Sequence, residues 1–397
     1  MDQINNLLSQ YVDQGFYPGI QWFVNVNNEI YSGKVGYNNI ETKAPVLDNT
    51  IYKIWSMTKP VVAVAAMQLI EQNRISLEDP ITKYLPEFLS LKVLKHQDAK
   101  IDEVEEMKNI PTIKDLFLHT AGFSYNFLAD PVGREYDKIR LFNSNTTSLE
   151  EEIKILSKAP LLFQPKTDWR YSVSMDVLAR ILEVVEKNTL QNILREKIFI
   201  PLKMYDTDFL ISPKSSNRLM QSYEFDPVNL KLTELIPDSQ KIGNYGYPFS
   251  EKSYARGGHG LFSTIKDYAL FAKMLHNGKT EDGHTIINEY SLKLMTTNAL
   301  ETRYLPIEIV SIGTIKDEAN YTNDLEAYGW GLGFRTLMEP KKNNNLGSVG
   351  EFGWAGAAST YFLVDNSKQM TALLMTQVVF GNPNLKNDFY NFIYTNF

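Results

Sequence analysis

A serine and a lysine stand three residues apart near the N-terminus, where they could act together in one chemical step. Ser56 is followed by Lys59, Pro60 and the apolar run at residues 61–67. Proline is tolerated only in the first turn of a helix, so Pro60 predicts a helix that begins close to Ser56. The run after it has no polar face, which predicts a helix buried on all sides. Because residues three apart share a helix face, we expect the Lys59 amine to reach the Ser56 hydroxyl.

This pair suits acyl transfer. A serine hydroxyl attacks poorly until a base removes its proton, and a lysine becomes that base when burial or a nearby cation disfavours its charged form. The chain contains no cysteine. Thiol nucleophiles, disulfides, Fe–S clusters and cysteine zinc sites are therefore excluded, and the nucleophile must be oxygen or nitrogen.

The spacing by itself is weak evidence, because Ser263 and Lys266 repeat it. In this second copy Thr264 and Asp267 form a capping pattern ahead of an apolar segment. That pattern is typical of an ordinary helix start and explains the second copy fully. Only the context of Ser56 separates the two.

The elements that must position the pair come from both ends of the chain. Alternation of apolar residues from Ile20 to Val26, interrupted at Asn27-Asn28, predicts a β-hairpin. Residues 361–364 and 370–375 flank a turn-rich segment and predict a second hairpin. Between them lie amphipathic helices, the clearest of which carries Leu178, Ile181, Leu182 and Val185 at helical spacing.

We therefore predict an α+β fold, an antiparallel sheet flanked by helices with a mostly helical insertion. Residues 1–75 and 240–397 would form a discontinuous α/β sandwich domain, and residues 76–239 the insertion. The junction between the two is the natural place for an active site.

Five segments, taken in order, carry a family resemblance. They are Ser56-Met57-Thr58-Lys59, Leu116-Phe117-Leu118-His119-Thr120-Ala121-Gly122, Tyr171-Ser172-Val173, the glycine-rich Gly257-Gly258-His259-Gly260, and Trp354-Ala355-Gly356. In these segments the chain resembles the serine β-lactamase-like family, and the resemblance runs from about residue 15 to 380. Within that family it resembles class C β-lactamases, D-alanyl-peptide hydrolases and their esterase relatives. The resemblance implies the β-lactamase/transpeptidase-like fold and a penicillin-binding-protein-like serine hydrolase that forms an acyl-enzyme.

The resemblance also implies roles for individual residues. Tyr171, its pKa lowered by lysine, would share the base role with Lys59 and return the proton to the leaving group. The backbone amides of Ser56 and Ala357 would hold the oxyanion, with Ala357 on an edge strand. Trp354 would be a wall of the substrate pocket rather than a chemical participant.

Two departures from the family pattern bear on the substrate. Val173 stands where the family has an asparagine that binds a substrate amide, and Trp354 stands where it has a lysine that binds a substrate carboxylate. Together with Ala355 and Gly356, these residues are the expected substrate-binding positions. The departures favour a carboxylesterase for small or apolar acyl esters. The alternatives are a weak β-lactamase or a hydrolase resembling D-aminopeptidases and DD-peptidases, and a non-catalytic penicillin-binding-like module.

Another candidate base is His119. Thr112 with Asp115 predicts the start of a short helix that Gly122 would end, so His119 is interpreted as a hydrogen-bonded structural residue. No His-Glu-x-x-His or other ligand pattern occurs in the sequence, and we expect neither a metal nor a cofactor.

Composition limits the remaining classes of function. The 397 residues carry 47 acidic and 40 basic side chains, a formal charge of −7, which argues against nucleic-acid binding. The longest apolar run, at residues 61–67, is far short of the ~20 residues of a membrane span. The first residues lack the pattern of a signal peptide. We expect a cytoplasmic protein, with unconventional secretion left open, that acts on a small-molecule ester, β-lactam or peptide and needs no obligate protein partner.

Overall fold

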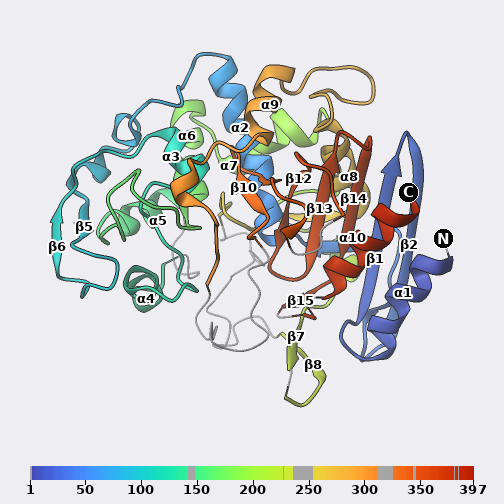
Figure 1. Ribbon diagram of the computed structural model, residues 1–397. Helices are drawn as coiled ribbons and strands as arrows, with labels where there is room; N and C mark the ends of the chain where they lie inside the picture. The colour runs from blue at the N-terminus through green and yellow to red at the C-terminus, as the bar shows by residue number, and fades with distance from the viewer. Residues whose placement is uncertain are drawn as a thin grey trace.

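The computed structural model describes residues 2–141, 148–226, 228–235, 254–310, 325–342, 346–379, 381–382 and 384–397. Its largest element is an antiparallel sheet to which both ends of the chain contribute (Figure 1). The strands follow the spatial order β10 (Tyr328–Trp330), β11 (Arg335–Leu337), β12 (Phe352–Gly356), β13 (Thr360–Asp365), β14 (Met370–Met375), β1 (Gly19–Val26), β2 (Glu29–Asn39) and β3 (Ala44–Pro45).

Both predicted hairpins are confirmed. β1 pairs with β2 across the turn at Asn27 and Asn28, which both have positive φ. Such turns match the right-handed twist of the strands that they join. β13 pairs with β14, and β14 pairs with β1, so the two hairpins lie side by side in the middle of the sheet.

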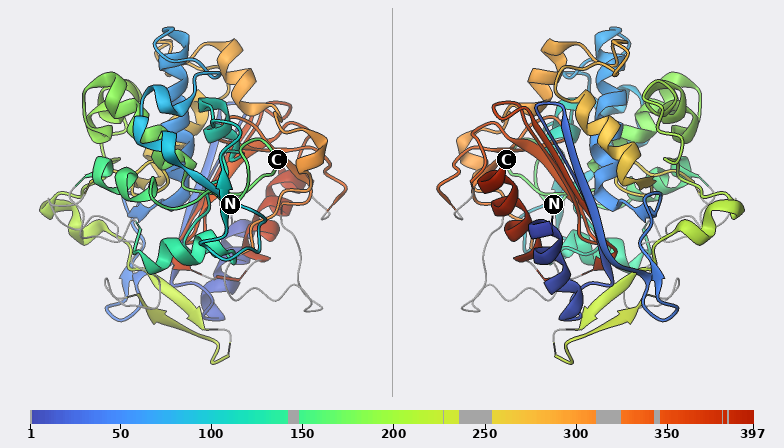
Figure 2. Two further views of the ribbon diagram at one scale, coloured as in Figure 1. Left: turned by 90° about the vertical axis from the view of Figure 1, so that its left-hand side faces the viewer. Right: turned by 90° about the vertical axis from the view of Figure 1, so that its right-hand side faces the viewer.

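Helices cover both faces of this sheet (Figure 2). Within the described residues the α-helices are α1 (Asp2–Asp13), α2 (Thr58–Glu71), α3 (Ile113–Leu118), α4 (Pro131–Lys138), α5 (Leu149–Leu156), α6 (Ser174–Glu186), α7 (Leu190–Leu194), α8 (Ile265–Met274), α9 (Glu289–Thr296) and α10 (Asn384–Asn396). α1 and α10 pack together on one face, and α8 packs against β1, β13 and β14 on the other. The predicted α+β fold is confirmed.

Small sheets connect the remaining segments. β4 (Ile51–Lys53) pairs with β9 (Phe262–Thr264), and β5 (Lys92–Leu94) pairs with β6 (Val104–Glu106). β7 (Tyr223–Asp226) pairs with both β8 (Lys231–Glu234) and β15 (Val378–Val379). The predicted domain boundary at residues 239 and 240 lies outside the described residues, and the division into two units stays a prediction.

The main apolar core surrounds α2. Every residue from 61 to 67 is buried, as the sequence predicts. The reason is that α2 packs against α6 and α7 and shares one apolar core with residues of the large sheet. A second core fills the space between the sheet and the pair α1 and α10. No helix within the described ranges is long and apolar enough to cross a membrane.

Candidate active site

A sharp turn leads from β4 into α2 and presents Ser56. Trp55 has φ +47, in the left-handed region that a bulky residue rarely adopts. It begins the short 3-10 helix η1 (Trp55–Met57), which runs directly into α2. Two hydrogen bonds fix the turn: the Ile54 amide donates to the Leu261 carbonyl, and the Tyr268 hydroxyl donates to the Met57 carbonyl. Backbone strain of this kind is retained where the surrounding structure enforces it, often at functional sites.

The predicted contact between Ser56 and Lys59 is confirmed. The Lys59 ammonium nitrogen Nζ lies 3.1 Å from Ser56 Oγ and donates to the Gly258 carbonyl at 2.7 Å. Lys59 is 1% exposed, and Ser56 is only partly buried. Burial lowers the pKa of Lys59 to about 7, although the nearby Asp176 carboxylate acts in the opposite direction. At neutral pH a large fraction of Lys59 is therefore the neutral amine that a general base must be.

Tyr171 reaches the same hydroxyl from a distant segment. Its phenol is hydrogen-bonded to Ser56, and its ring centre lies 4.7 Å from Lys59 Nζ. The expectation of a lowered pKa for Tyr171 is wrong. The ring is 4% exposed, and burial raises the pKa of Tyr171 above its ordinary value. The phenol therefore stays protonated near neutral pH and is suited to donate a proton.

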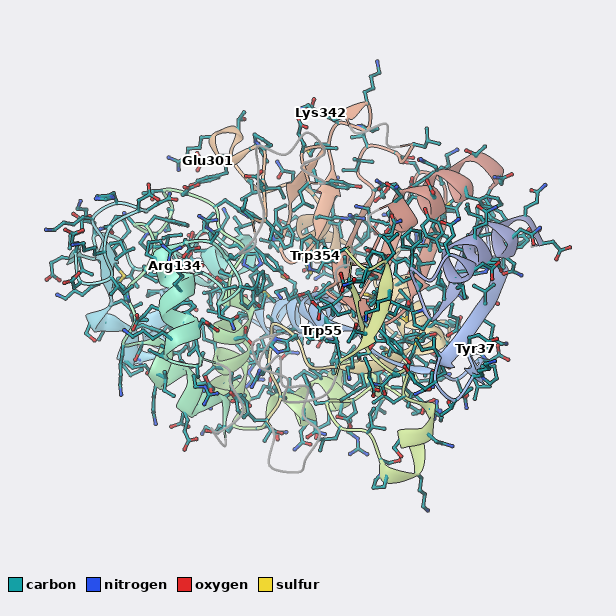
Figure 3. The ribbon with its side chains drawn as sticks, turned by 90° about the horizontal axis from the view of Figure 1, so that it is seen from below. Tyr37, Trp55, Arg134, Glu301, Lys342 and Trp354 are labelled. Atoms are coloured by element: carbon teal, nitrogen blue, oxygen red, sulfur yellow. The ribbon has the colours of Figure 1, made fainter. Side chains whose placement is uncertain are left out.

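Strand β12 brings Trp354 and Gly356 beside this group. The Trp354 indole N–H donates to the Tyr171 hydroxyl oxygen at 3.3 Å, a contact that goes beyond the expected role of a pocket wall. A Cβ on Gly356 would lie 2.4 Å from the Ile54 carbonyl oxygen. Only glycine lets β12 approach the turn before Ser56 so closely. Figure 3 shows Trp55 and Trp354 together in the middle of the molecule.

Ala357 does not lie on an edge strand, contrary to the expectation. β12 lies between β11 and β13 in the sheet, and Ala357 follows it in an exposed turn. The Ser359 amide closes this turn by donating to the Gly356 carbonyl. The role of the Ser56 and Ala357 amides as oxyanion donors stays a prediction.

The other predicted substrate positions differ in exposure. Ala355 is partly exposed on β12, whereas Val173 is buried and belongs to the main core at the start of α6. Trp330, which sequence reasoning did not single out, packs edge-on against Trp354 with ring centres 4.5 Å apart. Trp354, which stands where the family pattern has a lysine, is therefore packed against the aromatic rings of Trp330 and Tyr171.

Two further residues belong to the site, of which Asp176 was missed from sequence and Gly258 was named only as part of the glycine-rich segment. Asp176, five residues after Tyr171, is buried and accepts a hydrogen bond from the Gly258 amide. Gly258 in turn supplies the carbonyl that holds Lys59. The glycine pair at 257–258 was a visible signal for a close approach, but Asp176 has the sequence context of any acidic residue in a first helical turn.

The second Ser-x-x-Lys copy lies outside this arrangement, as predicted, whereas the His119 ring packs against Tyr171 with ring centres 4.9 Å apart. His119 Nδ1 is 3.1 Å from the Ser172 hydroxyl. Its left-handed backbone, rather than Gly122, ends α3. Ser263 is buried in β9 and bonded to Thr207, while Thr264 caps α8. Among the described residues, no group of three or more His, Asp or Glu side chains is placed to hold a metal ion.

Comparisons with known proteins show the family of the chain. A family model described as Beta-lactamase matches residues 4–393. Protein Rv1367c of Mycobacterium tuberculosis is 30% identical over 373 residues, which cover 89% of this chain and 86% of that protein. Esterase EstB of Burkholderia gladioli is 23% identical over 88% of this chain and 83% of its own length.

Among solved structures, EstCE1, described as a hydrolase with promiscuous acyltransferase activity, superposes with a TM-score of 0.81. The superposition covers 99% of this chain and 98% of that one at 20% identity, which supports the fold alone. The family match spans nearly the whole sequence, including every segment that contributes to the Ser56 site. The chain belongs to the Beta-lactamase family.

Proposed function

We propose that this protein is a serine hydrolase that forms an acyl-enzyme on Ser56, and that it is a carboxylesterase for small or apolar acyl esters. The observation that carries the proposal is the 3.1 Å contact of Ser56 Oγ with Lys59, whose pKa burial lowers to about 7. A neutral amine in that position removes the hydroxyl proton as the oxygen attacks an ester carbonyl.

The remaining groups suit the later steps. Ser56 Oγ bonds to the carbonyl carbon, its proton passes to Lys59 Nζ, and the oxyanion would be held by the Ser56 and Ala357 amides. The Tyr171 phenol then donates its proton to the departing alkoxide and regains one from the Lys59 ammonium. Water, or another acyl acceptor, then attacks the acyl carbonyl as Lys59 Nζ takes its proton. The bond from the acyl carbon to Ser56 Oγ breaks, and that proton passes from Lys59 to Oγ, which restores the Ser56 hydroxyl.

The ester preference rests on the aromatic surroundings of Ser56. A substrate carboxylate or amide would need a charged or polar partner, and burying it without one is costly. Trp354 donates its indole N–H to Tyr171, and Val173 is part of the apolar core. An uncharged ester with an apolar acyl group avoids that cost. The names of two similar proteins, an esterase and a hydrolase with acyltransferase activity, are consistent with this choice.

The test is labelling of the full chain with a fluorophosphonate, followed by intact and peptide mass spectrometry. A hydrolase gains one adduct on the peptide that contains Ser56. Absence of an adduct would contradict the proposal and favour a non-catalytic binding module. A panel of an ester, a thioester, an amide and a β-lactam then ranks substrates, and faster β-lactam than ester turnover would overturn the ester assignment.

The pH dependence provides a separate prediction. Because only neutral Lys59 accepts the proton, kcat/KM is expected to fall about tenfold per pH unit below pH ~7, the region to which burial lowers the pKa of Lys59. Burial raises the pKa of Tyr171, so loss of its proton should not reduce activity in the ordinary tyrosine range. The measurement is a pH profile with an ester that has no titratable group. A flat profile down to pH ~5 would contradict Lys59 as the base.

Replacing Tyr171 with phenylalanine should have an effect that depends on the leaving group. We expect kcat/KM for an alkyl ester to fall by about 10²-fold or more, because an alkoxide needs a proton to depart. A nitrophenyl ester should be affected less, since nitrophenolate leaves without one. Tyr136→Phe is the matched control, because Tyr136 is also fully buried but lies on α4. Equal effects of Tyr171→Phe on both esters would contradict the role of proton donor.

A further inference from the structure

Asp176 is a buried carboxylate in which only one of the two oxygens accepts a hydrogen bond from the described part of the chain. It is 1% exposed and is the third residue of α6. Its Oδ1 accepts the Gly258 N–H at 3.0 Å. Its Oδ2 has no hydrogen-bond partner within the part of the chain that the structure describes. A buried carboxylate in this state is costly unless a positive charge lies close to it.

Gly258 connects this carboxylate to Lys59. Its N–H donates to Asp176 and its carbonyl accepts the Lys59 ammonium at 2.7 Å. A Cβ on Gly258 would lie 2.5 Å from Asp176 Oδ2 and 2.4 Å from the Tyr125 hydroxyl. The glycine therefore packs directly on the carboxylate and links it, through one peptide group on each side, to the Lys59 amine.

Building on the proposed function, we propose that Asp176 is a positioning residue that fixes Gly258 against Lys59 and balances the charge of the ammonium formed during acylation. When Ser56 Oγ bonds to the ester carbonyl, its proton moves to Lys59 Nζ and the carbonyl electron pair moves onto the oxyanion. The new ammonium is buried, and a carboxylate behind it stabilises that charge. Asp176 touches neither the substrate nor the reacting oxygen in this role.

The other charged and titratable groups around the pair do not replace Asp176. Burial, reinforced by the charge of Lys59, keeps the pKa of His119 and of His259 well below the ordinary value, so both rings are neutral near pH 7. Arg256 and Glu152 act on Asp176 with opposite signs. Burial raises the pKa of Asp176 itself, and the Lys59 charge opposes that rise. The charge on each member of the buried pair therefore affects the pKa of the other.

The experiment compares Asp176→Asn with Asp267→Asn in the full chain. Asparagine at position 176 keeps an oxygen that can accept from Gly258 but removes the charge. Asp267 is the matched control because it is also a buried third residue of a helix, here α8, and accepts from Asp206 and Thr207. The readouts are the pH profile of kcat/KM and fluorophosphonate adduct formation.

Asp176→Asn should move the acid limb of the profile to lower pH, because removal of a negative charge lowers the pKa of Lys59. The plateau of kcat/KM should fall about tenfold or more, because the ammonium formed in acylation loses its balancing charge. Asp267→Asn should leave the limb in place. If Asp176→Asn changes neither the acid limb nor the plateau of kcat/KM, the inference is overturned and the proposed function stands. If the wild-type chain forms no fluorophosphonate adduct, the proposed function itself is contradicted.

A stability measurement keeps the inference testable if Asp176→Asn folds poorly. Lys59→Met, Asp176→Asn and the double variant are compared by urea unfolding. Each single variant leaves one buried charge without its partner, whereas the double variant removes both. We expect the double variant to be more stable than the sum of the single changes predicts, and strict additivity would overturn the coupling of the two charges.

Discussion

Ser56→Ala is expected to lower ester hydrolysis by about 10³-fold or more and to abolish the fluorophosphonate adduct. The reason is that the variant lacks the oxygen that lies 3.1 Å from Lys59. Ser56 is only partly buried, so loss of its hydroxyl should change the midpoint of thermal unfolding little. Steady-state kinetics with short nitrophenyl esters and a thermal melt measure the two effects. Residual turnover within tenfold of wild type would contradict Ser56 as the nucleophile.

The chain supplies its own control for this variant in the second Ser-x-x-Lys copy. Ser263 is buried in β9, and its hydroxyl contacts Thr207 and the Thr264 carbonyl. Ser263→Ala should keep the adduct and most of the turnover, and should lower stability by about 1 kcal/mol, the usual net value of a buried hydrogen bond. Loss of labelling in both variants would show that the effect of Ser56→Ala is not specific to the nucleophile.

Lys59→Met is expected to slow acylation by roughly 10²–10⁴-fold, the usual contribution of a general base. Methionine fills most of the buried volume but cannot accept the Ser56 proton or donate to the Gly258 carbonyl. The rate is best followed as the pre-steady-state release of nitrophenol, which isolates acylation from deacylation. The pH limb near 7 should also disappear, since the pKa that burial lowers to about 7 belongs to Lys59.

Lys53 provides the matched control for Lys59. It is also buried, with a pKa that burial lowers to about 8, but its ammonium donates to the Ser222 hydroxyl at 2.9 Å. Lys53→Met should leave acylation within a few-fold of wild type and the pH limb in place. If Lys59→Met acylates as fast as Lys53→Met, the base is another group and the mechanism proposed for Ser56 is wrong.

Local pattern in the sequence was enough to predict the elements that carry the site. The spacing of Ser56, Lys59 and Pro60 indicated a helix start, and the contact at 3.1 Å follows directly from helical geometry. Alternation of apolar residues predicted both central hairpins, because successive strand residues point to opposite faces. The ordered segments that resemble the family then predicted that Tyr171 and Trp354 lie near Ser56.

Packing between distant segments decided the rest. Neither the bond from Gly258 to Asp176 nor that from Trp354 to Tyr171 has a local signal, because 82 and 183 residues separate the partners. The pKa directions are also tertiary properties. Burial among aromatic and apolar side chains lowers the pKa of Lys59 and raises that of Tyr171. For Tyr171 this is the opposite of the direction expected from sequence. The order of residues along the chain thus determined which groups could react. Only the tertiary structure decided which of these groups holds a proton at neutral pH, because desolvation depends on the atoms that surround a group in space.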